Sequence, residues 1–323
     1  MGNYHGSQAN SRQKQTSFVT MTSCFKIPCA NRQKNLLFGE SRKKSNEKKI
    51  KMTTKLLIAH SPDSDDAYMM APIALGWLKD DEVFQRFSFE FIRSDIETLN
   101  QEALNARYDV TAISFGVYPE IEDKYDLLRA GSSIQEGTGP IIVAWESLKP
   151  EDLRERTIAI PGLRTSAYLA MRQWMPALNI VVVPFDKIMD GVADRRFDAG
   201  LLIHESQLMY RDKGLHLVAD LGDWWKNFHD LPLPMGGNAI RKDLPIEEKQ
   251  AFARLMRKSV QTAIARHQES IDYAQSFGRG MDREMVARYV RAWVNDFTVD
   301  VGERGARAVN TLLGRQVGWV GDQ

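Results

Sequence analysis

His204 stands where an apolar run, Ala199 to Ile203, ends, and Glu205 and Ser206 follow it directly. Histidine titrates near neutral pH and is the side chain most often used as a general base. A histidine at a strand end can equally be an ordinary hydrogen-bonded residue, so the stretch alone leaves both interpretations open. Neighbouring side chains along a strand face opposite ways, so we expect Glu205 to point away from His204 and to support structure.

Thr165 and Ser166 lie in the stretch PGLRTSAY, where a Pro-Gly turn precedes a helical pattern. A helix N-terminus offers free backbone N–H groups and the positive end of the helix dipole, and two hydroxyls beside it would suit a carboxylate or a phosphate. Plain N-capping needs only one of these hydroxyls and is the alternative interpretation. The GxxxxGK[ST] spacing of a phosphate loop is absent.

Three aspartates, Asp63, Asp65 and Asp66, occur within four residues after the apolar stretch KLLIAH. Their carboxylates could bind a hard cation, although the spacing of an EF-hand loop is absent. They could instead open a helix and complement its dipole, with Ser64 or Asp65 as the N-cap. The spacing favours this second interpretation.

Two further stretches hold candidate site residues. Ser114 ends the strand-like stretch VTAIS, but no GxSxG sequence surrounds it, so we do not expect a serine nucleophile there. Trp224, Trp225, Phe228 and His229 form an aromatic cluster that could line a pocket or could belong to the core beneath a loop.

The elements that carry these residues alternate between strand-like stretches, such as FSFEFIRS, and amphipathic helical stretches, such as DIETLNQEALNARYD. Such alternation predicts an α/β fold with mostly parallel sheets and helices on both faces. Ligands of these sheets bind beyond the carboxyl ends of the strands, where Ser61, Ser114, Thr165 and His204 all fall. The last stretch, 245–313, is predicted to be largely helical.

The charge of the chain is unevenly distributed. Residues 1–51 contain eleven Lys or Arg and two acids, whereas the rest of the chain is mildly acidic, which argues against nucleic acid as its main partner. No run of 18 apolar residues occurs, so no membrane span is predicted. Both cysteines, Cys24 and Cys29, lie in this basic lead, so the body has no disulfide framework and a cytoplasmic location fits.

The basic lead, residues 1–53, is predicted to be a disordered extension because its hydrophobicity is low and its charge is high. A translation start at Met52, just before the first predicted strand, would explain it as well. Targeting is a third interpretation, because a lead poor in acids resembles a transit peptide, but no secretory signal or long amphipathic helix is visible.

Eight stretches together resemble the 1,4-dihydroxy-6-naphthoate synthase family, which acts in menaquinone biosynthesis by the futalosine pathway. They are AHSPDSDDAYMMAPIALG, DIETLNQEAL, GPIIVA, PGLRTSAYLAM, DAGLLIHESQLMY, LVADLGDWWK, LPLPMGGNAIRKDL and WVNDFTVDVGERGARAV. The resemblance covers essentially all of residues 55–313 in order, and residues 1–53 have no counterpart in it.

The resemblance implies an α/β, two-lobed fold of the type 2 periplasmic-binding-protein kind, in which the chain crosses between the lobes twice. We place the two interlobe crossings near 139–144 and 233–239. Lobe 1 would then contain residues 54–142 and 238–323, and lobe 2 would contain residues 143–237.

The resemblance also implies a carbon–carbon lyase that cleaves cyclic dehypoxanthinyl futalosine and releases 1,4-dihydroxy-6-naphthoate, with no redox cofactor and no metal. His204 corresponds to the proposed general base of the family. Ser114, Thr165 and Ser166 would hold the carboxylate or the sugar-derived oxygens of a small anionic substrate. The other positions carried over as substrate-binding are Ser61, Asp66 and Asn100.

One departure concerns the first turn, where the family usually reads Ser-Pro-Cys-Pro-Asn-Asp-Thr and this chain reads Ser-Pro-Asp-Ser-Asp-Asp-Ala at 61–67. The added negative charge would repel an anionic substrate at short range, so the exact substrate stays open. The alternatives are a related chorismate-derived lyase and a non-catalytic solute-binding protein of the same fold. The sequence leaves the oligomeric state open.

Overall fold

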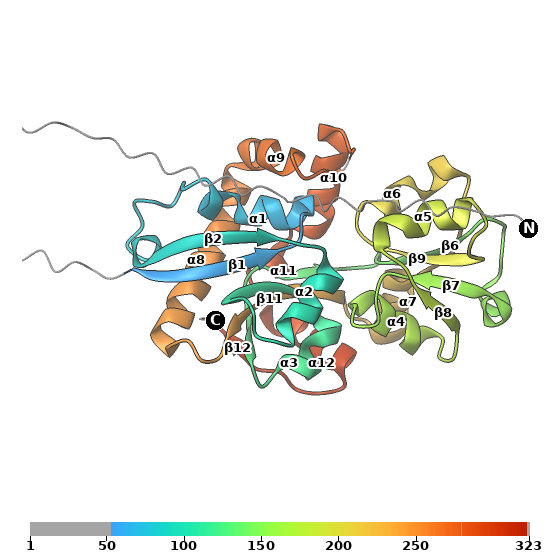
Figure 1. The fold of residues 1–323 in the computed structure, drawn as a ribbon, viewed down its shortest axis with the longest axis horizontal. Coiled ribbons are helices and arrows are strands. Elements are labelled where there is room, and N and C mark those ends of the chain that lie inside the picture. The colour runs from blue at the N-terminus through green and yellow to red at the C-terminus, as the bar shows by residue number, and fades with distance from the viewer. Residues whose placement is uncertain (1–52, 279, 322–323) are drawn as a thin grey trace, which may run out of the picture. The chain divides into compact units, whose positions relative to one another are not determined.

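A computed structural model describes residues 53–278 and 280–321 of the chain. The expectations for residues 1–52 of the basic lead, and for its two cysteines, fall on residues outside this description. Figure 1 shows the strands of the described residues gathered into two sheets, each flanked by helices.

The first sheet has seven strands in the order β12-β4-β11-β3-β1-β2, with β5 paired to β11. Its apolar stretches become strands because their side chains are buried on both faces, as in β3, where all five residues are buried. The strands are β1 Thr54–His60, β2 Phe87–Arg93, β3 Val110–Ser114, β4 Tyr125–Leu128, β5 Ser133–Gln135, β11 Leu233–Arg241 and β12 Trp319–Val320.

The second sheet has five strands in the order β10-β6-β9-β7-β8. Its two central strands β6 and β9 are fully buried, which matches their unbroken apolar sequences. The strands are β6 Ile141–Ala144, β7 Thr157–Ile160, β8 Asn179–Val182, β9 Ala199–Leu202 and β10 His216–Asp220.

Helices flank both sheets (Figure 1). Those grouped with the first sheet are α1 Ser64–Ala74, α2 Ile96–Ala103, α3 Tyr118–Ile121, α8 Ile246–Ala265, α9 His267–Gln275, α10 Arg283–Trp293, α11 Asp296–Val299 and α12 Gly302–Leu313. Those grouped with the second are α4 Ser166–Trp174, α5 Phe185–Ala193, α6 Ser206–Met209 and α7 Leu221–His229. The helical C-terminal stretch expected from the sequence is therefore present as α8 to α12.

The sheets are mixed, whereas the sequence predicted mostly parallel ones. Strand β6 is antiparallel to both of its neighbours, and β11 is antiparallel to β3, β4 and β5. These are the two strands by which the chain enters one sheet directly from the other. Each begins at the edge where the neighbouring strand β3 or β9 ends, and it therefore runs antiparallel to that strand.

The chain passes from the first sheet to the second between Gln135 and Ile141, and it returns between His229 and Leu233. These passages lie a few residues before the positions expected from the sequence, 139–144 and 233–239. We propose that the two sheets with their helices are the two lobes, and that the lobes meet at these passages.

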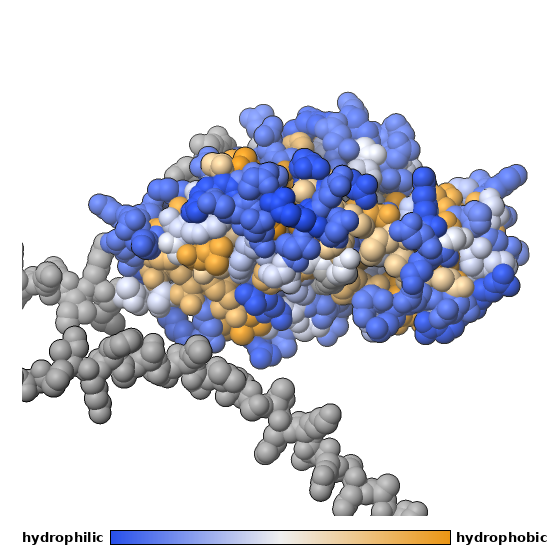
Figure 2. Space-filling view, turned by 90° about the horizontal axis from the view of Figure 1, so that it is seen from above, coloured by the Kyte–Doolittle hydropathy of each residue, from blue (hydrophilic) through white to orange (hydrophobic). Residues whose placement is uncertain are grey.

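The largest apolar core runs through both sheets, since it includes Ile113 of β3, Ile158 of β7 and Leu201 of β9. Trp225 is fully buried in it and donates its indole N–H to the carbonyl of Pro232 at 3.0 Å. Hydrophilic residues cover most of the face seen in Figure 2, and apolar residues form separate patches between them. Burial of the apolar residues of both sheets in one core ties the sheets together.

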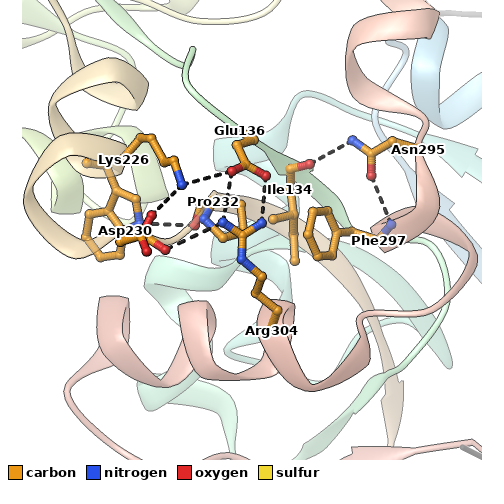
Figure 3. Close-up of polar contacts among 9 residues, drawn as sticks. Ile134, Glu136, Lys226, Asp230, Pro232, Asn295, Phe297 and Arg304 are labelled. Atoms are coloured by element: carbon orange, nitrogen blue, oxygen red, sulfur yellow. Dashed lines mark hydrogen bonds and ion pairs between the residues drawn. The ribbon is translucent and has the colours of Figure 1, made fainter.

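A cluster of ion pairs joins the two chain passages (Figure 3). Glu136 accepts hydrogen bonds from Arg304 of α12 at 2.6 and 2.8 Å, and lies 3.0 Å from Lys226 of α7. Lys226 also contacts Asp230, in the second passage, at 2.5 Å. Helix α12, grouped with the first sheet, and helix α7, grouped with the second, therefore both form ion pairs with the passages that connect the sheets.

Replacing Glu136 with glutamine should lower the free energy of unfolding by about 0.5–1 kcal/mol at pH 7, because partly exposed ion pairs are screened by solvent. Arg304 and Lys226 lower the pKa of Glu136 from 4.5 to about 2. A depressed carboxyl pKa stabilises the fold above the unfolded pKa, and this contribution is lost as pH falls from 4.5 towards 2. Urea unfolding of both proteins at pH 7 and pH 3 checks this: an equal difference at the two pH values would contradict it. Glu90→Gln, in an exposed pair with Lys55, is the control.

Candidate active site

A pocket lies between the strand ends of the two sheets. Six of the seven site residues predicted from the sequence line it: Ser61, Asp66, Ser114, Thr165, Ser166 and His204. Each follows or ends a strand of the parallel part of its sheet, so the carboxyl edges of the two sheets face the same space.

Asn100, the seventh predicted residue, lies behind this lining rather than in it. Its side chain is fully buried in α2. Its amide Nδ2 donates to the hydroxyl of Ser114 at 3.1 Å, and its Oδ1 accepts from the backbone N–H of the same serine at 2.9 Å. Asn100 therefore fixes the position of Ser114 from both its backbone and its side chain.

The sequence suggested both helix capping and ligand binding for Thr165 and Ser166, and the two residues differ in these roles. Thr165 is the N-cap of α4: its hydroxyl accepts from the backbone N–H of Tyr168 at 3.2 Å and donates to the carbonyl of Gly162 at 3.0 Å. Ser166 instead accepts a hydrogen bond at 3.0 Å from the backbone N–H of Gly116, which follows β3 of the other sheet. Capping therefore accounts for Thr165, while Ser166 faces the pocket and links the sheets.

Gly116 allows this approach of the two backbones. A Cβ at this position would lie 2.9 Å from the carbonyl oxygen of Arg164 and 3.1 Å from the backbone of Thr165. Neither neighbour is the flexible end of a side chain, so only glycine fits here.

The acidic turn after β1 is buried, and its carboxylates have separate partners. Asp66 accepts from the backbone N–H of Ser61 at 2.9 Å, and Asp65 accepts from the hydroxyl of Ser133 at 3.1 Å. Asp63 accepts from the hydroxyl of Ser61 and lies against His204. The prediction that Ser64 or Asp65 caps α1 is wrong, because Asp63 occupies the N-cap position and no side chain caps this helix.

Burial changes the protonation of this turn. It raises the pKa of Asp65 from 3.8 to about 6, and repulsion from Asp63 adds to the rise. Burial and the same kind of repulsion raise the pKa of Asp66 well above its usual range. The turn therefore carries less negative charge than its sequence suggests. No group of three or more His, Cys, Asp or Glu among the described residues has the arrangement of a metal site.

His204 occupies the turn between β9 and α6 in a left-handed conformation, with φ +56°. Its side chain is 18% exposed and lies 3.1 Å, Nδ1 to Oδ2, from Asp63 of the other sheet. The ring of Phe185 packs edge-on at 5.2 Å from the imidazole. The Gln207 amide accepts from the backbone N–H of His204 at 3.2 Å and donates to Gly139 at 2.7 Å. The turn that presents His204 is therefore bound to a chain passage.

Sequence reasoning did not assign pocket roles to Asp63, Ser133, Gln207, Tyr289 and Trp293, although all five line the pocket. Tyr289 and Trp293 are four residues apart on α10, a spacing that places them on one face of a helix. That spacing is visible in the sequence, but the packing partner of the face is not. The aromatic cluster of α7 lies elsewhere, since none of its four residues lines this pocket.

No helix among residues 53–278 and 280–321 has the length and apolarity needed to cross a membrane. Similarity to solved structures of low sequence identity concerns the fold alone. The alkanesulfonate-binding protein of Xanthomonas axonopodis, solved with bound MOPS, is 12% identical, has a TM-score of 0.57, and covers 74% of this chain and 84% of its own. The predicted two-lobed fold of the type 2 periplasmic-binding-protein kind is thereby confirmed.

Two curated relatives named 1,4-dihydroxy-6-naphthoate synthase match most of the chain. The Thermus thermophilus protein is 35% identical over 259 residues, and the Streptomyces coelicolor protein is 34% identical over 266 residues. Each match covers 80% of this chain and 92% of the relative. A solved Archaeoglobus fulgidus protein is 42% identical with a TM-score of 0.74, over 80% of this chain and 96% of its own.

The model of a family described as menaquinone biosynthesis matches residues 56–317. This match covers every residue that lines the pocket, all of the second sheet, and the first sheet except β12 and the first two residues of β1. The resemblance read from the sequence is confirmed: the chain belongs to the menaquinone biosynthesis family.

Proposed function

We propose that the chain is a carbon–carbon lyase that converts cyclic dehypoxanthinyl futalosine into 1,4-dihydroxy-6-naphthoate. The observation that carries the proposal is that His204 lines the same pocket, at the strand ends of two sheets, as the hydroxyl residues Ser114, Thr165 and Ser166. The curated relatives that bear the name of this synthase support it, because the chain covers 92% of each. A small anionic substrate and a cytoplasmic location are parts of the same proposal.

The hydroxyl side of the pocket would bind the substrate's carboxylate. Ser114 and Ser166 lie there beside the N-terminus of α4, whose free N–H groups and dipole favour an anion. Asn100 holds Ser114 in place, and Gly116 brings the turn after β3 up to α4. One end of the substrate is thereby fixed relative to His204.

The acidic side of the pocket would face the ribose-derived part of the substrate. Burial raises the pKa of Asp66 well above its usual range, and a carboxyl group that has taken up a proton both donates and accepts hydrogen bonds. Hydroxyl groups of a sugar-derived ring offer matching donors and acceptors. This arrangement accommodates the three aspartates without the full repulsion that their charges would exert on an anion.

His204 would act between these two sides as the general base. It removes a proton from a hydroxyl or a carbon of the cyclised ribose-derived ring. The carbon–carbon bond to the ribose-derived fragment then breaks, this fragment leaves as the naphthol ring becomes aromatic, and the imidazolium returns its proton. Positioning such a base contributes roughly 10²–10⁴ in rate. Enclosure between the two sheets would exclude water and hold the reacting bond beside the imidazole.

A product assay tests the proposal. Purified protein incubated with cyclic dehypoxanthinyl futalosine should release 1,4-dihydroxy-6-naphthoate, identified by its mass and ultraviolet spectrum. The second candidate is a non-catalytic solute-binding protein, which the fold of the alkanesulfonate-binding protein favours. Saturable binding without product would support that candidate and refute the lyase. Conversion of another chorismate-derived compound alone would indicate a related lyase.

Replacing Ser166 with alanine should raise KM about 10- to 150-fold and change kcat much less. The variant loses a hydrogen bond to the charged carboxylate, which is worth about 1.5–3 kcal/mol, and it also loses the hydrogen bond from the Gly116 backbone. Initial rates over a range of substrate concentrations measure this, and Ser147→Ala, at an exposed position of the same lobe, is the control. An unchanged KM would remove Ser166 from the substrate site.

A further inference from the structure

The contact between Asp63 and His204 joins two residues that lie 141 positions apart and belong to different sheets. Oδ2 of Asp63 lies 3.1 Å from Nδ1 of His204, and the aspartate side chain is 4% exposed. The hydroxyl of Ser61 donates to the same Oδ2, which fixes the carboxylate from its own turn. The imidazole therefore meets a carboxylate that is itself held in place.

Helix capping does not account for Asp63. It occupies the N-cap position of α1, but its side chain makes no capping hydrogen bond. Asp95 occupies the same position of α2 and does cap its helix, accepting from the backbone N–H of Thr98 at 3.0 Å and from its hydroxyl at 2.6 Å. Both aspartates lie between a strand of the first sheet and the helix that follows it. Asp95 caps its helix, whereas Asp63 contacts His204.

We propose that Asp63 is a positioning residue that holds the proton of neutral His204 on Nδ1, so that Nε2 is the basic nitrogen that faces the substrate. A carboxylate accepts the Nδ1–H hydrogen bond and selects this tautomer, because the opposite tautomer would place a lone pair against a negative oxygen. Phe185 packs against the ring and limits its rotation. The catalytic consequence rests on the proposed function, whereas the tautomer does not.

Asp63 and His204 come from different sheets, so their contact depends on how the sheets are arranged. Asp63 follows β1 of the first sheet and His204 follows β9 of the second, so their contact requires the two strand ends to lie together. The arrangement of the two sheets that encloses the pocket therefore also sets the tautomer of His204.

The tautomer can be measured without substrate. In full-length protein labelled with ¹⁵N-histidine, at a pH where the ring is neutral, the His204 signals should show a protonated Nδ1 and an unprotonated Nε2. The chain has six histidines, and His204→Asn identifies the signals by their loss. Asp63→Asn should shift His204 towards a mixture of tautomers, while Asp95→Asn should leave it unchanged.

Kinetics provide the second readout. Asp63→Asn should lower kcat by up to about 10⁴-fold, the effect of leaving a general-base histidine in the wrong tautomer, and should change KM less than threefold. Asp95→Asn is the matched control, because asparagine caps a helix as well as aspartate does, and it should keep wild-type kcat. A loss of kcat equal in both variants would show a structural effect only and would overturn the proposal.

The remaining outcomes separate the two proposals. A wild-type His204 with its proton on Nε2, or an Asp63→Asn protein with the wild-type tautomer and kcat, overturns the role of Asp63 and leaves the lyase intact. The expected tautomers in a wild-type protein that forms no product support Asp63 and overturn the lyase. If Asp63→Asn does not fold, Asp63→Cys supplies the comparison, and the wild-type spectrum alone still decides the tautomer.

Discussion

Replacing His204 with asparagine is expected to lower turnover by roughly 10²–10⁴-fold, the range for loss of a positioned general base. Asparagine is the suitable substitute because residue 204 has φ +56°, a left-handed conformation that asparagine adopts more readily than most residues. It cannot accept a proton at neutral pH, so chemistry is lost while the backbone of the turn is kept. Rapid-mixing measurement of one turnover, with enzyme in excess, reports this step.

Binding distinguishes the loss of a base from a damaged pocket. Calorimetric titration of His204→Asn should give a dissociation constant for the substrate within about tenfold of the wild-type value, because the hydroxyl side is untouched. His216→Asn, at an exposed position of β10, is the control and should turn over normally. Wild-type turnover in His204→Asn would refute the assignment of the base.

Replacing Asp65 with asparagine is expected to raise the free energy of unfolding by about 2–3 kcal/mol at pH 8. Burial raises the pKa of this carboxyl from 3.8 to about 6, so the folded chain opposes its ionisation. A carboxyl with a raised folded pKa costs nothing below the unfolded pKa, and the fold loses stability as pH rises from 3.8 to 6. At about 1.36 kcal/mol for each pKa unit, this loss has the expected size. Asparagine removes the charge and still accepts the Ser133 hydroxyl.

The pH dependence of this gain is its signature. Urea unfolding should show a difference between Asp65→Asn and the wild type that is below about 1 kcal/mol at pH 4 and reaches its full value near pH 6. Asp80→Asn, at an exposed position of the same lobe, should show no comparable gain. A variant less stable than the wild type at pH 8 would show that the carboxylate stabilises the turn, contrary to this account.

The strand-end residues of the pocket could be predicted from the sequence because their positions follow from a local pattern. An apolar strand followed by a polar turn marks Ser61, Ser114 and His204, and parallel connection brings such turns to one edge. The antiparallel direction of β6 and β11 could not be predicted from the sequence in the same way. Their direction depends on which sheet the preceding segment belongs to, and no residue of the strand itself records that.

The contacts of individual side chains were harder to predict from the sequence than the sheet edge at which these side chains lie. Asn100 was expected at the substrate but lies behind Ser114, because its position depends on how α2 packs beside β3. Asp63 was interpreted as a helix-opening acid, but its carboxylate meets a histidine from the other sheet. No local spacing in the sequence indicates a contact between residues that are far apart in the chain.

The departure of the first turn from the family pattern acquires a physical account. The residue in the usual cysteine position, Asp63, lies against His204, while burial raises the pKa of Asp65 and Asp66. The turn therefore offers one carboxylate to the histidine and two groups that take up protons more readily than ordinary aspartates. The added acids form part of the site that surrounds the base.

The most direct test of the central claim, that His204 acts on a substrate held between the two sheets, is a crystal structure of His204→Asn with cyclic dehypoxanthinyl futalosine. We expect the substrate's carboxylate to lie on the hydroxyls of Ser114 and Ser166. We also expect an atom of the ribose-derived ring within about 3.5 Å of residue 204, as a reacting pair requires. A substrate bound outside this pocket, or turned with its carboxylate towards Asp65 and Asp66, would contradict it.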